Sequence, residues 1–145
     1  MITGEIKNKI DSIWDDFFSA GMSEYLTVIE QFSYLMFIHS LDEVENEIEQ
    51  YEKFSGEKKE HIFPADKQNY RWHIFKTFEE TELFKLMDEE IFPFIKAING
   101  NEESAFARYM KDAAFSIPSP QTLKAVITKL DELFENPEVQ VRDML

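Results

Sequence analysis

The feature that most constrains the fold is a long helical pattern that begins at Tyr25. Apolar side chains recur along it at three- and four-residue spacing, and between Phe32 and Leu41 they surround the helix axis. A helix that is apolar on every side must be buried by other elements. We therefore expect this helix, with Ser23 as its N-cap, to be the central and most buried element. Beyond Leu41 acidic residues dominate, and that end should project into solvent.

Amphipathic helical patterns occur on both sides of this segment. The chain has only 4 Gly and 5 Pro in 145 residues, which is few for a protein built from short strands and tight turns. The sequence therefore predicts a single compact all-α domain of about five to seven helices. The other helical patterns cover residues 6–18, 83–98, 105–113 and 123–134, and Ser119 and Pro120 are the expected N-cap and first residue of the last one.

Three local signals predict where helices begin, bend or give way to loops. Thr77 and Glu80 have the spacing of a capping box at a helix start. Pro93 lies inside a helical pattern and lacks the backbone N–H, so we expect a kink or break near Ile91. Residues 54–69 show no helical period, and we expect an exposed, mobile loop there.

The net charge limits the classes of partner. Asp plus Glu total 29 against 15 Lys plus Arg, for a formal charge of −14. Such a field repels phosphate, argues against a self-sufficient nucleic-acid-binding module and suits a basic protein partner. No cysteine is present, no signal peptide is evident, and the longest apolar run, at 34–38, is far shorter than the ~20 residues of a membrane span. We expect a cytoplasmic protein.

No motif predicts an active site or a cofactor site. The glycines stand alone, which excludes the glycine-rich phosphate loops. The carboxylates of residues 43–52 are interpreted as a solvated helix face. His39 and Glu43 have helical spacing for a metal pair, but without a second histidine nearby we favour a core-edge histidine whose ring nitrogens bond to neighbours. We therefore assign no catalytic, cofactor-binding or metal-ligating residue.

The segment KQNYRWHIFK at 67–76 contrasts with the acidic chain, because it holds cations and aromatic rings without a carboxylate. One interpretation is a local nucleic-acid contact, in which Arg71 with Lys67 or Lys76 meets phosphates and Trp72 stacks on or braces a base. The other is that Trp72 and Phe75 pack inward while Arg71 and Lys76 pair with acids. The pattern alone favours the second interpretation.

Four stretches together resemble the N-terminal helical domain of the M subunit of type I restriction–modification systems, an adenine-specific DNA methyltransferase. Each stretch is unspecific alone, but their order and spacing match over nearly the whole chain. They are IDSIWDDFF at 10–18, YLTVIEQFSYLMFIHSLDEVE at 25–45, YRWHIFK at 70–76 and FARYMKDAAFSIPSPQTLKAVITKLDEL at 106–133, of which the last is the most specific.

The resemblance implies a function that residues 1–145 do not carry alone. In this family a Rossmann-like catalytic domain follows, binds S-adenosylmethionine and methylates adenine N6 in DNA. Its Asn-Pro-Pro-aromatic motif is not in this sequence, since Asn136-Pro137 is followed by Glu138. We therefore expect residues 1–145 to be the N-terminal domain of a longer polypeptide, non-catalytic and without a cofactor of its own.

The resemblance also implies the partners. The family's helical domain works with a second M subunit and a specificity subunit and helps to close the complex around DNA. On this basis Arg71, Trp72 and Lys76 are the candidate residues near DNA or a partner subunit, with Trp72 also anchoring its helix. The alternative hypothesis is a free-standing acidic helical interaction domain that mimics the charge of DNA toward a basic partner.

Overall fold

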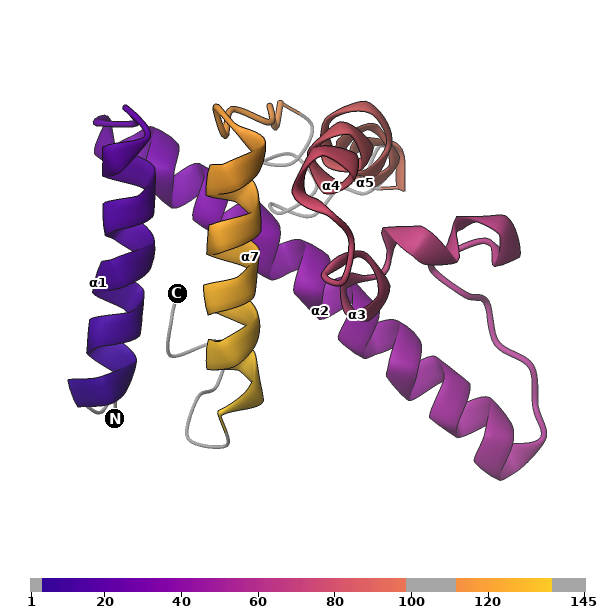
Figure 1. The fold of residues 1–145 in the computed structure, drawn as a ribbon. Helices are drawn as coiled ribbons and strands as arrows, with labels where there is room; N and C mark the ends of the chain where they lie inside the picture. The colour runs from indigo at the N-terminus through magenta and orange to yellow at the C-terminus, as the bar shows by residue number, and fades with distance from the viewer. Residues whose placement is uncertain (1–3, 99–111, 137–145) are drawn as a thin grey trace.

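The protein is an all-α domain crossed by one long helix, α2 (Tyr25–Ser55). The structure, a computed structural model, describes residues 4–98 and 112–136, and within these ranges it contains six α-helices and no strand. Figure 1 shows α2 running diagonally behind the other helices, with its C-terminal end extending beyond them. The predicted fold class is confirmed.

The middle of α2 is the most buried part of that helix, as the sequence predicts. Val28, Leu35 and Ile38 are almost fully buried, and apolar side chains from the whole described chain pack around them. The expectation for the C-terminal part of α2 is only partly right. Residues 53–55 are exposed, but Asp42 and Glu45 are buried because a later segment of the chain folds back over them.

The rest of the core is formed where α7 (Pro120–Glu135) lies between α1 (Gly4–Ser19) and α4 (Glu80–Leu86) (Figure 1). Each of these helices presents an apolar face at three- and four-residue spacing and buries it against its neighbours. Burial of these faces is the main favourable term for the fold. Their buried residues are Ile6, Ile13 and Phe17 on α1, Leu83 and Leu86 on α4, and Leu123, Val126, Ile127, Leu130 and Leu133 on α7.

Of the two N-caps predicted for α7 and α2, one is confirmed and one is wrong. The hydroxyl of Ser119 accepts the amide N–H of Thr122 at 3.2 Å, and Pro120 occupies the first turn of α7 as expected. The cap residue of α2 is Glu24 rather than Ser23, and its side chain makes no capping hydrogen bond. The long buried core of α2 makes a side-chain cap unnecessary for its formation.

The predicted capping box at the start of α4 is wrong by two residues. Glu79 is the cap, and its carboxylate accepts the amide N–H groups of Thr81 and Glu82 at 2.9 and 3.1 Å. The hydroxyl of Thr77 instead donates to a carbonyl group of the preceding turn. A carboxylate at the N-cap accepts hydrogen bonds from two amides that have no partner within the helix. Its negative charge also interacts favourably with the positive N-terminal end of the helix dipole.

Pro93 disturbs its helix as predicted, through a widened turn. Residues Met87–Ile91 form a π-helical turn between α4 and α5 (Phe92–Ile98). The amide of Phe92 donates to the carbonyl of Met87, five residues back. Proline cannot donate in the ladder and crowds the preceding turn, and a π turn relieves both problems without ending the element.

The segment expected to be a mobile, exposed loop is more ordered than predicted. Helix α2 continues to Ser55 and ends at Gly56, whose φ of 75° is the left-handed conformation that glycine adopts most easily. Residues 56–61 are exposed, but Phe63 is 3% exposed, and Ala65–Tyr70 forms a short 3-10 helix. The helix Ala65–Tyr70 is too short to show a helical period in the sequence.

One predicted element falls on a part of the chain that lies outside the described residues. This is the short helix over 105–113, of which only residues 112 and 113 are described. Within residues 4–98 and 112–136, no helix is both long enough and apolar enough to cross a membrane.

Candidate functional site

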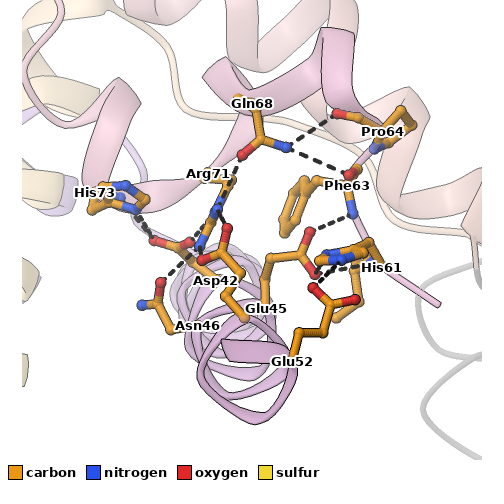
Figure 2. Close-up of polar contacts among 12 residues, drawn as sticks. Asp42, Glu45, Asn46, Glu52, His61, Phe63, Pro64, Gln68, Arg71 and His73 are labelled. Atoms are coloured by element: carbon orange, nitrogen blue, oxygen red, sulfur yellow. Dashed lines mark hydrogen bonds and ion pairs between the residues drawn. The ribbon is translucent and has the colours of Figure 1, made fainter. Parts of the chain in front are cut away.

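The most distinctive polar feature is a row of carboxylates on one face of α2. Asp42, Glu45, Glu49 and Glu52 are separated by three or four residues, so their side chains lie one above another along the helix. The segment of residues 61–73 returns along this face and meets the row, as Figure 2 shows for its central residues.

Arg71 is the centre of this polar network. Its Nε donates to Asp42 Oδ1 at 2.6 Å, and its Nη1 and Nη2 donate to the two oxygens of Glu49 at 2.9 and 3.0 Å. Nη1 also donates to Gln68, and Nη2 to Asn46 (Figure 2). A guanidinium has five N–H donors, and all five are used within the chain. The side chains of Arg71 and Asp42 are 3% and 5% exposed, whereas that of Glu49 is 46% exposed, so the network runs from a buried ion pair to the surface of α2.

Asp42 is held as a carboxylate by donors on both oxygens. Its Oδ2 accepts the backbone N–H of His73 at 3.0 Å and lies 2.8 Å from the Nδ1 of the same residue. Burial alone would raise the pKa of Asp42, but the hydrogen bonds from His73 and Arg71 together outweigh it and lower that pKa. The hydrogen bond from Arg71 is likewise the main cause that lowers the pKa of Glu49.

Glu45 binds the returning chain by its backbone. Its two oxygens accept the amide N–H groups of Ile62 and Phe63 at 3.1 and 3.0 Å, and its side chain is 1% exposed. The ring of His61 lies between two carboxylates, with Nδ1 3.2 Å from Glu45 and Nε2 2.7 Å from Glu52 (Figure 2). The prediction that the acids of 43–52 form a solvated face is therefore wrong for Glu45, whose amide partners are 17 and 18 residues away.

The next residues of the segment bind to α7 instead of α2. Trp72, in α3 (Trp72–Phe75), is 2% exposed and donates its indole N–H to Asp131 at 2.9 Å. Lys76 donates to the other oxygen of Asp131 at 3.0 Å, and this hydrogen bond is the main cause that raises the pKa of Lys76. Residues 71–76 therefore join α2 to α7.

His39 is a core-edge residue, as the sequence interpretation favours, but the expectation that its ring nitrogens bond to neighbours is wrong for Nδ1, which is buried without a hydrogen bond. Its ring stacks on Phe134 with centroids 3.8 Å apart and meets the edge of Trp72. The Nδ1 lies 3.0 Å from a Glu43 oxygen, within ion-pair distance but without hydrogen-bond alignment. Burial lowers the pKa of His39 although Glu43 opposes it. In the part of the chain that the structure describes, no group of histidines and carboxylates is arranged to hold a metal ion.

The amino-acid sequence matches a known family. The family model described as the HsdM N-terminal domain matches residues 6–130. The chain belongs to this family, the N-terminal domain of the M subunit of type I restriction–modification systems. No curated protein and no solved structure matches the chain significantly.

Helix α2 holds the segment before α7, which is part of the most specific of the four stretches that resemble the HsdM N-terminal domain. The buried side chain of Gln31 donates to the carbonyl of Ala114 at 2.8 Å and accepts the N–H of Ser116 at 3.1 Å. The side-chain amide of Gln31 thus bonds both a carbonyl group and an N–H group of the segment that precedes α7. The sequence reasoning missed Gln31, although a lone polar residue inside the apolar pattern of α2 is a usable signal.

For the candidate residues of the HsdM N-terminal domain, the geometry supports the packing interpretation of the sequence. Trp72 and Phe75 are buried, and Arg71 and Lys76 pair with acids of this chain. Whether Arg71, Trp72 and Lys76 also lie near DNA or a partner subunit stays a prediction. The row at 42, 45, 49 and 52 was missed as a unit, and its three- and four-residue spacing is the signal that identifies it.

Proposed function

We propose that this chain is the assembly domain of a type I restriction–modification DNA methyltransferase subunit. The observation that carries the proposal is the family match, which covers residues 6–130. In this proposal the complete M subunit transfers a methyl group from S-adenosylmethionine to adenine N6. The helical domain is non-catalytic by itself, and a separate domain binds the cofactor and takes the adenine out of the duplex.

Two observations support an assembly role, one from the geometry and one from the composition. The buried network around Arg71 and the contacts of Trp72 and Lys76 with Asp131 fix the long helices relative to each other. A rigid scaffold reduces the ordering cost of association. The net charge of −14 disfavours DNA as a partner of the isolated domain and favours basic protein surfaces.

The proposed partners are the specificity subunit and a second M subunit, and DNA is held by the complex they form. In this arrangement base recognition belongs to the specificity subunit. The acidic helical domain contributes protein–protein contacts that close the complex around DNA, and its own negative field limits nonspecific attachment to phosphate.

The test compares the complete M subunit with a version that lacks residues 1–136, each co-expressed with the specificity subunit. We expect the complete complex to transfer labelled methyl groups from S-adenosylmethionine to adenine N6. The shortened subunit should still bind S-adenosylmethionine, which controls for folding, but should assemble poorly with its partners. Normal assembly and methylation by the shortened subunit, or absence of adenine methylation by the complete complex, would overturn the proposal.

The acidic composition favours one alternative, a domain that mimics the charge of DNA toward a basic protein. This alternative predicts that the chain displaces DNA from a basic DNA-binding protein in a competition assay. The assembly role predicts instead that the chain and DNA are present together in one complex with the specificity subunit, as native mass spectrometry would detect.

A further inference from the structure

Three apolar side chains at the start of α2 are unusually exposed. Tyr25 is 67% exposed, Leu26 64% and Ile29 45%. Ile29 is four residues from Tyr25 and three residues from Leu26, so its side chain neighbours both of them on the surface of the helix. Single exposed apolar residues are common on protein surfaces, but a contiguous group is typical of an interaction site.

Helix α1 extends this exposed group with two aromatic rings. Trp14, Phe18 and Tyr25 form a triangle in which each pair of ring centroids is 5.7 or 5.8 Å apart. Trp14 and Phe18 are half-buried and pack against the hydrophobic core, which holds the exposed group in place. We call Trp14, Phe18, Tyr25, Leu26 and Ile29 the corner patch. Aromatic residues held in this way are enriched where proteins bind each other.

The surroundings of the corner patch are acidic. The sequence has no lysine or arginine between Lys9 and Lys53, and Asp15 and Glu24 are exposed next to the patch residues. Among the described residues, three lysines on or beside α1 pair with carboxylates: Lys9 contacts Glu132 at 2.6 Å, Lys129 contacts Asp16 at 2.7 Å and Lys7 contacts Asp11 at 3.1 Å. The patch is therefore an apolar surface with a negative rim.

We propose that the corner patch binds an amphipathic helix of a partner subunit whose apolar face is flanked by lysine and arginine. Apolar residues at helical spacing fit an exposed aromatic surface, and the flanking cations complement the carboxylates that border it. This proposal rests on the proposed assembly function and specifies the chemistry of the partner. A neutral segment would gain only the apolar contacts, and an acidic segment would in addition be repelled by the rim.

The first test places a photo-cross-linking residue in the patch of the complete M subunit. Leu26→p-benzoylphenylalanine is introduced, the subunit is co-expressed with the specificity subunit, and cross-linked peptides are identified by mass spectrometry. We expect a peptide from another subunit with apolar residues at three- and four-residue spacing and adjacent lysines or arginines. Glu47→p-benzoylphenylalanine, at an exposed position further along α2, is the control and should not capture that peptide. Cross-links confined to the same chain, or to an acidic segment, would overturn the proposal.

The second test measures assembly with a matched pair of substitutions. Ile29→Asp places a charge in the patch, and Val44→Asp places the same charge at a position of nearly equal exposure, 43%, on the same helix. We expect Ile29→Asp to weaken association about tenfold or more, as for a buried interface residue, and Val44→Asp to leave it within about twofold. Leu26→Asp, at a more exposed position, serves as the second patch variant, and circular dichroism of each subunit checks its folding.

The outcomes separate this inference from the proposed function. If the wild-type complex assembles and methylates adenine but Ile29→Asp and Leu26→Asp associate normally, only the corner patch proposal fails. If the wild-type complex does not methylate adenine, the proposed function fails, and the cross-linking result still decides what the patch binds.

Discussion

Arg71 donates its Nε–H to Oδ1 of Asp42 across 2.6 Å, and both side chains are almost completely buried. The pair connects the middle of α2 to the first residue before α3. Because both charges are removed from water, their desolvation offsets much of the attraction between them. The pair therefore contributes less to stability than would be lost if one partner alone were removed.

Arg71→Ala should strongly destabilise the domain. The substitution leaves the buried carboxylate of Asp42 without its main cationic partner, and breaking such pairs costs about 3–5 kcal/mol. Urea denaturation of the variant and the wild type measures the difference. An unchanged free energy of unfolding combined with weaker complex assembly or DNA binding would instead place Arg71 at a partner or DNA surface.

A double variant isolates the cause of this loss. Arg71→Ala combined with Asp42→Asn removes both charges, so part of the stability lost in the single variant should return. Arg71→Lys keeps a positive charge but lacks the planar fork that reaches Asp42, Asn46 and Glu49 together, and it should fall between wild type and Arg71→Ala.

Glu45→Ala should release the returning chain from α2. The variant leaves the amide N–H groups of Ile62 and Phe63 without their acceptor, which costs about 1–3 kcal/mol. Hydrogen exchange should therefore become faster at those two amides than elsewhere in the domain. Glu47→Ala, on the exposed side of the same helix, should change neither stability nor exchange. Equal exchange in the two variants would contradict the anchoring role of Glu45.

The sequence was sufficient to predict the long helices α1, α2 and α7 and which one is central, because the spacing of apolar residues reports directly on the buried face. The apolar residues that surround the axis between Phe32 and Leu41 predicted the buried middle of α2, and Ser119 with Pro120 predicted the start of α7. These signals are local, so they do not depend on which other element packs against the helix.

The polar network could not be predicted in the same way, because its partners are far apart in the chain. Asp42 and Glu49 lie 29 and 22 residues from Arg71, and their spacing alone does not distinguish a solvated acidic face from one that binds a returning arginine. Residues 54–69, which lead to Arg71, have no helical period in the sequence, so their path back along α2 is fixed by tertiary contacts. Only the composition of residues 67–76, basic in an acidic chain, indicated that partners existed.

Substitutions at the start of α4 test whether Glu79 is its N-cap. Glu79→Ala removes the acceptor for two amide N–H groups and should cost about 1 kcal/mol of stability. Glu80→Ala, one residue later, retains that acceptor and should have a smaller effect. Thermal denaturation of both variants measures the difference, and a larger loss for Glu80→Ala would support the original capping box instead.

His61 should make stability depend on pH near neutrality. Burial alone would lower the pKa of His61, but the carboxylates of Glu52 and Glu45 outweigh it and raise that pKa above the ordinary value of 6.5. A raised pKa means that the folded state holds the proton more tightly, so the stabilisation is complete below about pH 6.5 and is lost as pH rises through the folded pKa.

The pH effect of His61 is measured as the difference in unfolding free energy between wild type and His61→Gln. This difference should shrink between about pH 6 and pH 8. The pKa of His39 is lowered by burial, so its own contribution changes in the opposite direction, but it is present in both proteins and cancels. A difference that stays constant or grows over that range would mean that the contacts of His61 with Glu45 and Glu52 do not stabilise its protonated form.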